Sequence, residues 1–201
     1  MPGKRLLVLG ATGGTGREVV TQALQQGDEV TALERVRVIV GDVLRDREAL
    51  ESAVRSQDAV ISALGVGKSL RSGGLIGRST PDIVQAMERL GIRRLIVTSA
   101  YGVGDTWRDV PAVPRFFIRT LLRDLYADKE VGERPLRDST LDWTLVYPVT
   151  LTNGPRTGHY RAGERLALRG FPTISRADVA DFLLTQVEDR RYIRKGVLVS
   201  Y

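Results

Sequence analysis

A glycine-rich loop near the start of the chain constrains its fold more than any other feature. Residues 10–16 read GATGGTG, directly after the apolar run 6–9, and an amphipathic helical pattern follows. Gly10 permits a tight turn, Gly13 lets the backbone approach a pyrophosphate, and Gly16 lets the helix pack closely on the sheet. The N–H groups at the start of the helix then face an anion. In this strand–loop–helix context the pattern predicts a dinucleotide-binding loop.

The rest of the chain alternates between apolar strand-like runs and amphipathic helical patterns. Such alternation is typical of a parallel sheet with helices on both faces. We therefore predict an α/β fold, a doubly wound and mostly parallel Rossmann sheet that forms one domain over residues 1–201. The expected strands are 5–10, 30–33, 36–40, 58–65, 93–100, 142–148 and 196–201. One helix is expected directly after the glycine loop, and the others are expected at 46–57, 79–91, 113–139 and 174–187.

Cap-type residues indicate where two of these helices begin and where one ends. Thr80 followed by Pro81 is typical of a helix start, and Gly91 then marks the end of the same helix. Ser175 and Asp178 stand at the spacing of a capping box, which predicts a helix that begins just after the serine.

The stretch EVTALERVRVIVGDV (29–43) conflicts with a parallel sheet. It contains two strand-like runs, 30–33 and 36–40, separated only by Glu34 and Arg35. A return along a parallel strand spans ~17 Å, whereas two residues reach at most ~7 Å. The second run therefore either pairs antiparallel or follows a segment of about 10–15 residues that this sequence lacks near residues 33–35. We expect the missing segment.

Composition argues against several classes of protein. No apolar run approaches the ~18 residues of a membrane span, so we expect no membrane partner. The net charge is +6, but the basic residues are scattered in pairs and are not interleaved with aromatics, so we expect no nucleic-acid partner. The chain has no cysteine, which suits a reducing cytoplasm, where we expect the protein. One histidine and scattered carboxylates predict no metal site.

Six motifs together resemble the atypical short-chain dehydrogenase/reductases. Within that group the chain is most similar to the NAD(P)H-binding flavin reductase / biliverdin reductase B family, with NmrA-like proteins as relatives. The resemblance runs from end to end, with the motifs in the family's order. These motifs are GATGGTG (10–16), GDV (41–43), SALG (62–65), TSAYG (98–102), LDWTLVYP (141–148) and ISRADVADFLL (174–184).

The resemblance implies a set of residues that hold a dinucleotide cofactor. It places Asp42 and Val43 at the adenine, although Asp42 also suits a helix cap. It puts an arginine in the segment after the second strand, which favours NADP(H) over NAD(H). If the sequence is continuous, Glu34 instead favours NAD(H). The expected cofactor-binding residues are Gly10, Thr12, Gly13, Gly14, Thr15, Gly16, Arg35, Asp42, Val43, Leu64, Gly65, Ser99 and Pro148.

Ser99 and Lys129 are the expected catalytic residues, because they match positions that the resemblance assigns to the catalytic serine and to a conserved helix lysine. The family's tyrosine–lysine pair is missing, since Tyr126 stands only three residues before Lys129. We find no tyrosine or histidine placed to help Ser99 donate a proton. We therefore expect Ser99 to supply one hydrogen bond, Tyr126 to pack, and Tyr101 to approach the pocket or to form its wall.

Other positions depart from the family or have two interpretations. Tyr147 replaces the common arginine, and Val149 stands where biliverdin reductase B has a histidine. His159, the only histidine, is expected on the surface. The glycine-rich stretch 65–79 predicts a mobile flap over the substrate, with a solvated linker as the alternative.

Together these features predict hydride transfer from NADPH to an acceptor that needs little proton assistance. A flavin fits this description, as does a quinone or a tetrapyrrole-like ring. Two alternatives remain, an NmrA-like regulator that binds NADP without turnover and a sugar-nucleotide epimerase-like enzyme, which the missing tyrosine–lysine pair disfavours. We expect a monomer or a weak homodimer.

Overall fold

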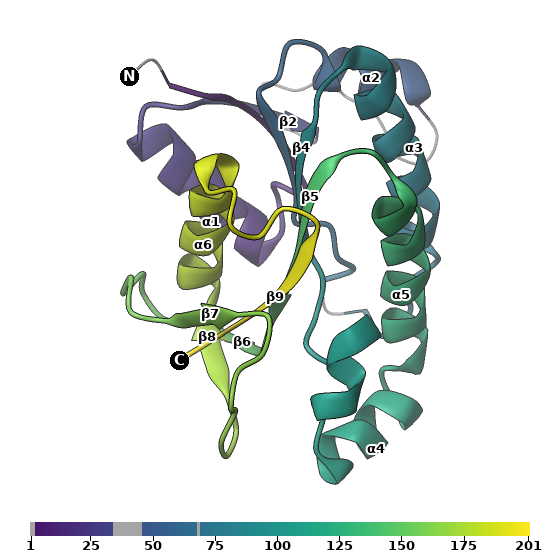
Figure 1. Cartoon of the computed structure of the whole chain (residues 1–201), viewed down its shortest axis with the longest axis vertical. Helices are drawn as coiled ribbons and strands as arrows, with labels where there is room; N and C mark the ends of the chain where they lie inside the picture. Colours follow the sequence, from purple (N-terminus) through teal and green to yellow (C-terminus); the bar gives the residue numbers. More distant parts are fainter. Residues whose placement is uncertain (1–2, 34–45, 68) are drawn as a thin grey trace.

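A mostly parallel sheet forms the centre of the protein (Figure 1). The computed structural model describes residues 3–33, 46–67 and 69–201, and within them seven strands form this sheet. Strands β2, β1, β3, β4, β5 and β9 pair in that order and all run parallel, while β7 pairs antiparallel with β9. Their bounds are β1 Arg5–Leu9, β2 Glu29–Leu33, β3 Ala59–Ser62, β4 Arg94–Thr98, β5 Asp142–Pro148, β7 Arg161–Gly163 and β9 Lys195–Ser200.

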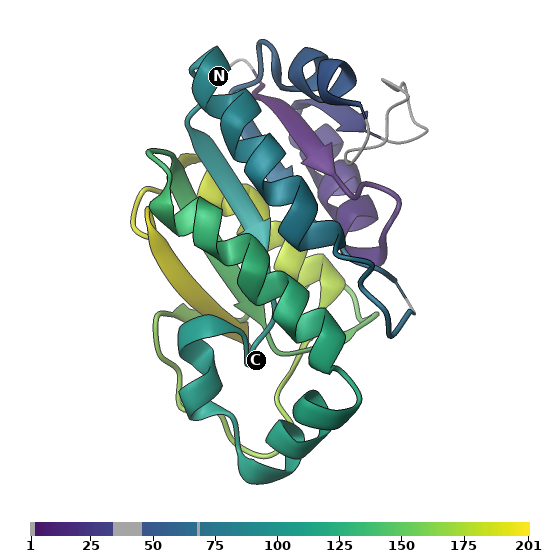
Figure 2. The same cartoon turned by 90° about the vertical axis from the view of Figure 1, so that its right-hand side faces the viewer.

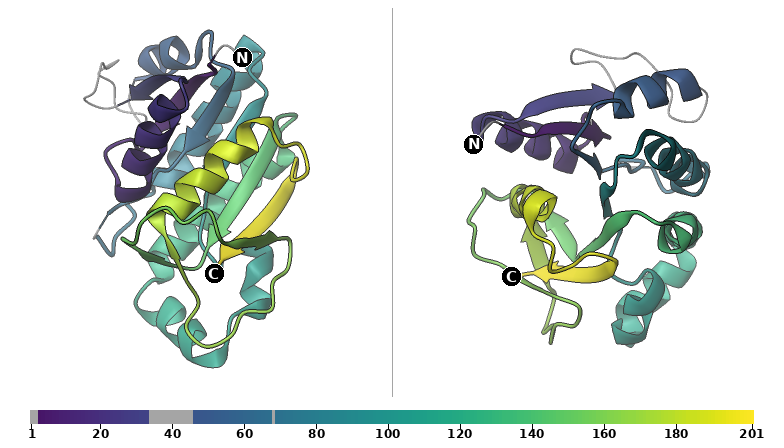
Figure 3. Two further views of the ribbon diagram at one scale, coloured as in Figure 1. Left: turned by 90° about the vertical axis from the view of Figure 1, so that its left-hand side faces the viewer. Right: turned by 45° about the horizontal axis from the view of Figure 1, so that its top comes forward.

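Helices cover both faces of the sheet, as Figures 1 and 3 show. Helices α1 and α6 pack against each other on one face, and α2, α3 and α5 lie on the other. Residues 6–9 of β1 are fully buried because both faces of the strand are covered. The predicted doubly wound Rossmann fold is confirmed. The bounds are α1 Gly14–Gln25, α2 Arg47–Val54, α3 Leu75–Leu90, α5 Arg123–Asp138 and α6 Arg176–Glu188.

The direction in which strands are added reverses at β1. This strand pairs with β2 on one side and with β3 on the other, and a ligand crevice is expected at such a switch point. Gly10 ends β1 with a φ of +79°, and a Cβ there would lie 2.6 Å from the carbonyl oxygen of Ala63, which follows β3. Only glycine fits this position, which explains why the loop begins with one.

The start of α6 agrees with the cap predicted at Ser175. Its hydroxyl accepts a hydrogen bond from the N–H of Asp178 at 2.9 Å. The carboxylate of Asp178 has other partners, accepting from the N–H groups of Thr157 and Gly158 at 2.7 and 2.8 Å and from the hydroxyl of Tyr201 at 2.7 Å. Asp178 therefore ties a long loop and the C-terminus to the helix.

Helix α3 begins earlier than the sequence predicts. It starts at Leu75, so Thr80 and Pro81 lie inside the helix rather than at its N-terminus. The cap comes from another element, because the carboxylate of Asp128 in α5 accepts from two N–H groups of the first turn, at 3.0 and 2.8 Å. Residues 75–79 are therefore helical, and only the first part of the predicted flap is a loop. The predicted end at Gly91 is confirmed, with a φ of +71°.

Two excursions from the sheet meet at one end of the molecule. The first contains the 3₁₀ helix η1 (Gly104–Asp109) and α4 (Ala112–Thr120). The second contains β7 and a small parallel sheet of β6 (Thr150–Thr152) and β8 (Thr173–Ser175). Figures 1 and 2 place α4 and the segment between β7 and β8 at this same end.

Several predictions concern residues 34–45, which lie outside the described residues. The expected strand 36–40, the proposed gap near 33–35 and the predicted cofactor residues Arg35, Asp42 and Val43 all fall there. Within the described part of the chain, no helix is long and apolar enough to cross a membrane.

Candidate functional site

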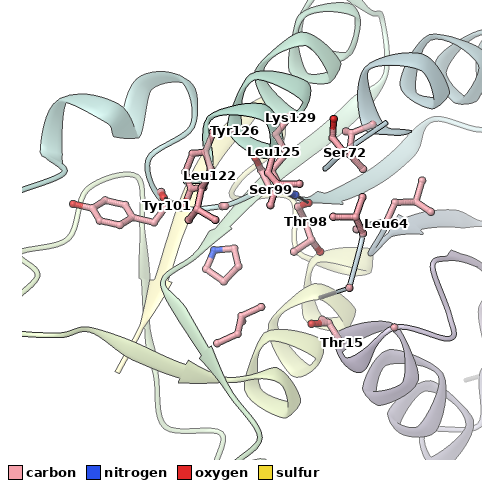
Figure 4. A pocket seen from close by; sticks show the side chains of 18 of the residues that line it. Thr15, Leu64, Ser72, Thr98, Ser99, Tyr101, Leu122, Leu125, Tyr126 and Lys129 are labelled. Carbon is pink, nitrogen blue, oxygen red and sulfur yellow. Dashed lines mark hydrogen bonds between the residues drawn. The ribbon is translucent and has the colours of Figure 1, made fainter. Parts of the chain in front are cut away.

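A large cleft opens at the carboxyl ends of the central strands (Figure 4). Its volume is about 1600 Å³, which exceeds the ~300–1,000 Å³ of ordinary small-molecule sites. In Figure 4, Thr15 of the glycine loop and Tyr101 lie towards opposite ends of the cleft, with Ser99 between them. The cleft therefore has room for a dinucleotide and for a second molecule beside it.

The glycine loop presents the N-terminus of α1 to this cleft. Gly13 is the N-cap of the helix and gives it no side-chain cap, so first-turn N–H groups are available to an anion. A Cβ on Gly16 would lie 2.0 Å from the carbonyl oxygen of Gly10, so the close packing inferred from the sequence is present. Arg176 of α6 lies directly beside Gly14 and adds a positive charge. This end of the cleft suits a pyrophosphate.

The structure brings most of the predicted site residues together. Gly16 lies beneath the loop, and Arg35, Asp42 and Val43 are outside the described residues. His159 is exposed and does not line the cleft, whereas Val149 does. The predicted residues that line the cleft are Gly10, Thr12, Gly13, Gly14, Thr15, Leu64, Gly65, Ser99, Lys129 and Pro148.

Ser99 has a partner that the sequence analysis missed. Its hydroxyl donates a hydrogen bond of 2.7 Å to Oε1 of Glu133, whose side chain lies on α5 and is buried, with the residue 4% exposed. The hydroxyl of Tyr147 donates to Oε2 of Glu133 at 2.8 Å, and Arg137 lies 3.3 Å from the same oxygen. Burial first, and Glu133 second, raise the pKa of Tyr147, so this phenol stays protonated.

The expectation concerned tyrosine and histidine only, whereas the group that contacts the Ser99 hydroxyl is the carboxylate of Glu133. Glu133 is 34 residues from Ser99 in sequence, and no motif links the two. It lies four residues after Lys129 on α5, and such a spacing places two side chains on one face of a helix. That spacing was the signal in the sequence that could have revealed Glu133.

Lys129 reaches the same region from α5. Its Nζ lies 3.4 Å from the carbonyl oxygen of Thr98, at the end of β4. Burial lowers the pKa of Lys129, and the nearby carboxylates of Glu133 and Asp128 partly oppose that effect. The ammonium group therefore stands at the junction of the cleft and the buried carboxylate.

The two tyrosines of the cleft have hydroxyl groups that are already engaged. Tyr126 donates to the carbonyl oxygen of Tyr101 at 3.2 Å, and Tyr101 donates to the carbonyl oxygen of Asp109. Burial raises the pKa of both phenols. Tyr101 forms part of the wall and Tyr126 packs beside it, so neither replaces the missing catalytic tyrosine.

The end of the cleft beyond Ser99 is apolar and largely open. Val113 and Phe117 of α4 line it from one excursion, and Phe171 lines it from the segment between β7 and β8. Phe171 is 94% exposed and Phe117 is 53% exposed. Exposed aromatic side chains at the mouth of a cleft are typical of a binding site. Sequence reasoning missed these residues because no motif marks them.

The cleft shows no sign of a metal centre in the described ranges. Across residues 3–33, 46–67 and 69–201, no group of three or more histidine, aspartate or glutamate side chains is arranged to hold a metal ion.

Comparison with known proteins identifies the family. Residues 10–190 match the NAD(P)H-binding family model, which covers most of the chain. The protein belongs to this NAD(P)H-binding family. The matched range includes the glycine loop, which lines the cleft.

Three known proteins illustrate what the chain is similar to in sequence or in fold. The UPF0659 protein YMR090W of Saccharomyces cerevisiae is 28% identical over 206 residues, covering 90% of this chain and 85% of that protein. A candidate NADH-flavin reductase from Streptococcus pneumoniae is 25% identical, with a TM-score of 0.79 and coverage of 98% and 99%. A short-chain dehydrogenase/reductase from Veillonella parvula in complex with NADP shares the fold, with 23% identity, a TM-score of 0.80 and coverage of 98% and 94%.

Proposed function

We propose that the protein is an NADPH-dependent reductase that transfers a hydride to a flavin or to a similar conjugated acceptor. The observation that carries the proposal is the continuity of the cleft. It runs from the glycine loop, past Ser99, to an apolar end lined by aromatic side chains. A nicotinamide and a planar acceptor can therefore lie side by side, which is what direct hydride transfer needs.

The chemistry of the cleft supports an acceptor of this class. The nicotinamide supplies the hydride, so the protein has to bind, orient and exclude water rather than provide a nucleophile. Phe117 and Phe171 offer faces on which a flat ring can stack. The description of the pneumococcal relative as an NADH-flavin reductase points to the same acceptor class.

Oxidation of NADPH in the presence of FMN, riboflavin or a quinone dye tests this function. We expect turnover that depends on both the protein and the acceptor. Tight binding of NADPH without turnover of any acceptor would contradict the proposal and would favour a dinucleotide-sensing regulator.

The protein is expected to prefer NADP(H) over NAD(H) by about tenfold or more. The preference follows from the family resemblance, which implies an arginine near the 2′-phosphate, and one charge-assisted hydrogen bond contributes about 1.5–3 kcal/mol. Calorimetric titration of both nucleotides measures the ratio. Equal or tighter binding of NAD(H) would refute it and would point to Glu34 as a ribose ligand.

Phe171→Ala is expected to raise the KM for FMN about three- to tenfold and to leave the dissociation constant of NADPH unchanged. The ring borders the acceptor end of the cleft, far from the glycine loop, and the loss of one stacked aromatic contact costs about 0.5–1.5 kcal/mol. Leu24→Ala is the matched control, because Leu24 is 57% exposed on α1 and does not line the cleft. An unchanged KM would mean that the acceptor does not reach Phe171.

A further inference from the structure

Ser99 forms a wall between two cavities. It lines the large cleft, and it also lines a small cavity of about 10 Å³ between β4, α3 and α5. Glu133 lines only the small cavity, so its carboxylate reaches the cleft through the hydroxyl of Ser99. In the view of Figure 4, Ser99 and Thr98 lie below Lys129 and above Thr15 of the glycine loop.

We propose that Glu133 holds a proton for the reaction and delivers it to the reduced acceptor through Ser99. This inference rests on the proposed function. The hydride leaves NADPH with its electron pair and bonds to the acceptor, which becomes an anion. The O–H bond of Ser99 breaks as its proton moves to that anion, and the protonated carboxyl group of Glu133 gives its own proton to the Ser99 oxygen. NADP⁺, a neutral reduced acceptor and a Glu133 carboxylate remain.

The contact between the two residues serves both directions of proton transfer. At 2.7 Å, the distance is typical of an O–H···O hydrogen bond in which either oxygen can be the donor. With Glu133 ionised, Ser99 donates to it, and with Glu133 protonated, the serine proton can turn towards the cleft. Serine alone is too weak an acid to donate the proton. As a relay it can do so without a lowered pKa, because its oxygen receives a proton from Glu133 as it gives up its own.

Hydrogen-bond donors and positively charged side chains surround the Glu133 carboxylate. Tyr147 from β5 and Arg137 from α5 both contact Oε2, which leaves Oε1 to Ser99. Arg137 in turn pairs with the exposed Asp105 of η1 at 3.3 Å. Lys129 lines the same small cavity and adds a second positive group, while α3 contributes only uncharged side chains to its lining. These cations stabilise the carboxylate that remains after the transfer.

The small cavity offers a route by which Glu133 can regain a proton after the transfer. A volume of about 10 Å³ is close to the space that one water molecule needs. Thr98 lines both cavities, and its hydroxyl is buried with no hydrogen-bond partner in the described part of the chain. Lys129 also lines both. A water molecule held by these groups would connect Glu133 to the solvent of the cleft.

The relay matters for acceptors that need a proton after the hydride and not for those that leave as anions. A flavin can accept a hydride and leave as the anionic dihydroflavin, so its reduction needs no proton from the protein. A linear tetrapyrrole becomes a neutral product only when a proton follows the hydride. The sequence predicts an acceptor that needs little proton assistance, and the relay through Glu133 extends the range to acceptors that need a proton.

Glu133→Gln tests the relay, because glutamine keeps the shape of the side chain but carries no transferable acid proton. With biliverdin as the tetrapyrrole probe, we expect kcat to fall about 100-fold, the loss typical of a missing proton donor. With FMN, we expect kcat to change by less than about threefold. The dissociation constant of NADPH should stay the same. Glu130→Gln is the matched control, since Glu130 is exposed on the same helix.

Two further readouts separate proton delivery from a structural role. Ser99→Ala should reproduce the acceptor-dependent loss, and the double variant should be no slower than either single variant, because the two residues act as one unit. Glu133→Asp keeps a carboxyl group at this site, so it should retain more of the activity with biliverdin than Glu133→Gln does.

The outcomes distinguish the relay from the function on which it rests. Equal activity of Glu133→Gln and Glu130→Gln with both acceptors would overturn the relay. Equal losses with FMN and biliverdin, or wild-type turnover of FMN without any turnover of biliverdin, would also overturn it. A wild-type protein that oxidises NADPH with neither acceptor would overturn the proposed function together with the relay.

Discussion

Gly13→Val is expected to give a folded protein that binds NADPH at least about 100-fold more weakly. A pyrophosphate at the start of α1 makes charge-assisted hydrogen bonds to backbone N–H groups, each contributing about 1.5–3 kcal/mol. A valine side chain would occupy the space above those groups, and the loss of two such bonds exceeds a factor of 100 in affinity. The φ of Gly13 is −71°, and a Cβ there meets only the carbonyl oxygen of Gly10, at 3.3 Å.

Gly16→Ala is the contrasting variant for the same loop. A Cβ at that position would lie 2.0 Å from backbone, so the loop itself has to move and the melting temperature should fall. Calorimetry with NADPH and thermal unfolding distinguish the two effects. A folded Gly13→Val variant with unchanged NADPH affinity would show that the glycine loop is not the cofactor site.

Asp178→Ala is expected to cost about 3–5 kcal/mol of the free energy of unfolding. Asp178 is fully buried, and its removal leaves the N–H groups of Thr157 and Gly158 and the hydroxyl of Tyr201 without their acceptor. A hydrogen bond to a charged group contributes about 1.5–3 kcal/mol, and the lower end of that range applies here because Thr157 and Gly158 are exposed and Tyr201 is 42% exposed. For a chain of this length the melting temperature should fall by about 6–20 °C.

The same carboxylate should make the stability depend on pH. Burial alone would raise the pKa of Asp178, but hydrogen bonds from Tyr201, Gly158 and Thr157 outweigh it and hold the pKa below its ordinary value. The unfolded chain therefore binds more protons, so this contribution is complete above the unfolded pKa of about 3.9 and is lost as pH falls through the folded value. Thermal melts from pH 7 downwards should show the loss in the wild type and a weaker one in Asp178→Ala.

Glu188→Ala provides the control for this prediction. Glu188 ends the same helix and pairs with Lys4 at 3.3 Å, but both side chains are largely exposed. An exposed ion pair contributes about 0–1 kcal/mol. If the two variants lost stability equally, the buried network around Asp178 would not be the cause.

The parts of the fold that the sequence predicted are those with a local physical cause. Leu6 to Leu9 form an uninterrupted apolar run because β1 is covered on both faces, and Gly10 is required by a positive φ beside Ala63. The predicted start of α3 was wrong because the helix is capped by Asp128, which lies about fifty residues away in sequence. A cap donated by another helix leaves no signal in the local sequence.

The candidate site shows the same division. The residues of the glycine loop and Ser99 were predicted because their neighbours in sequence form recognisable motifs. Glu133 was missed because its role depends on the packing of α5 against the end of β4. Phe171 was missed because a three-residue strand and a long excursion bring it to the cleft. The four-residue spacing between Lys129 and Glu133 predicts that they share a helix face, but not that this face packs against the end of β4.

The most direct test of the central claim is the oxidation of NADPH carrying deuterium at the transferable position, with FMN as acceptor. We expect acceptor-dependent oxidation that is slower with the deuterated cofactor in single-turnover measurements and that is lost in Gly13→Val. Tight NADPH binding with no acceptor-dependent oxidation, or oxidation that is the same in Gly13→Val as in the wild type, would contradict it.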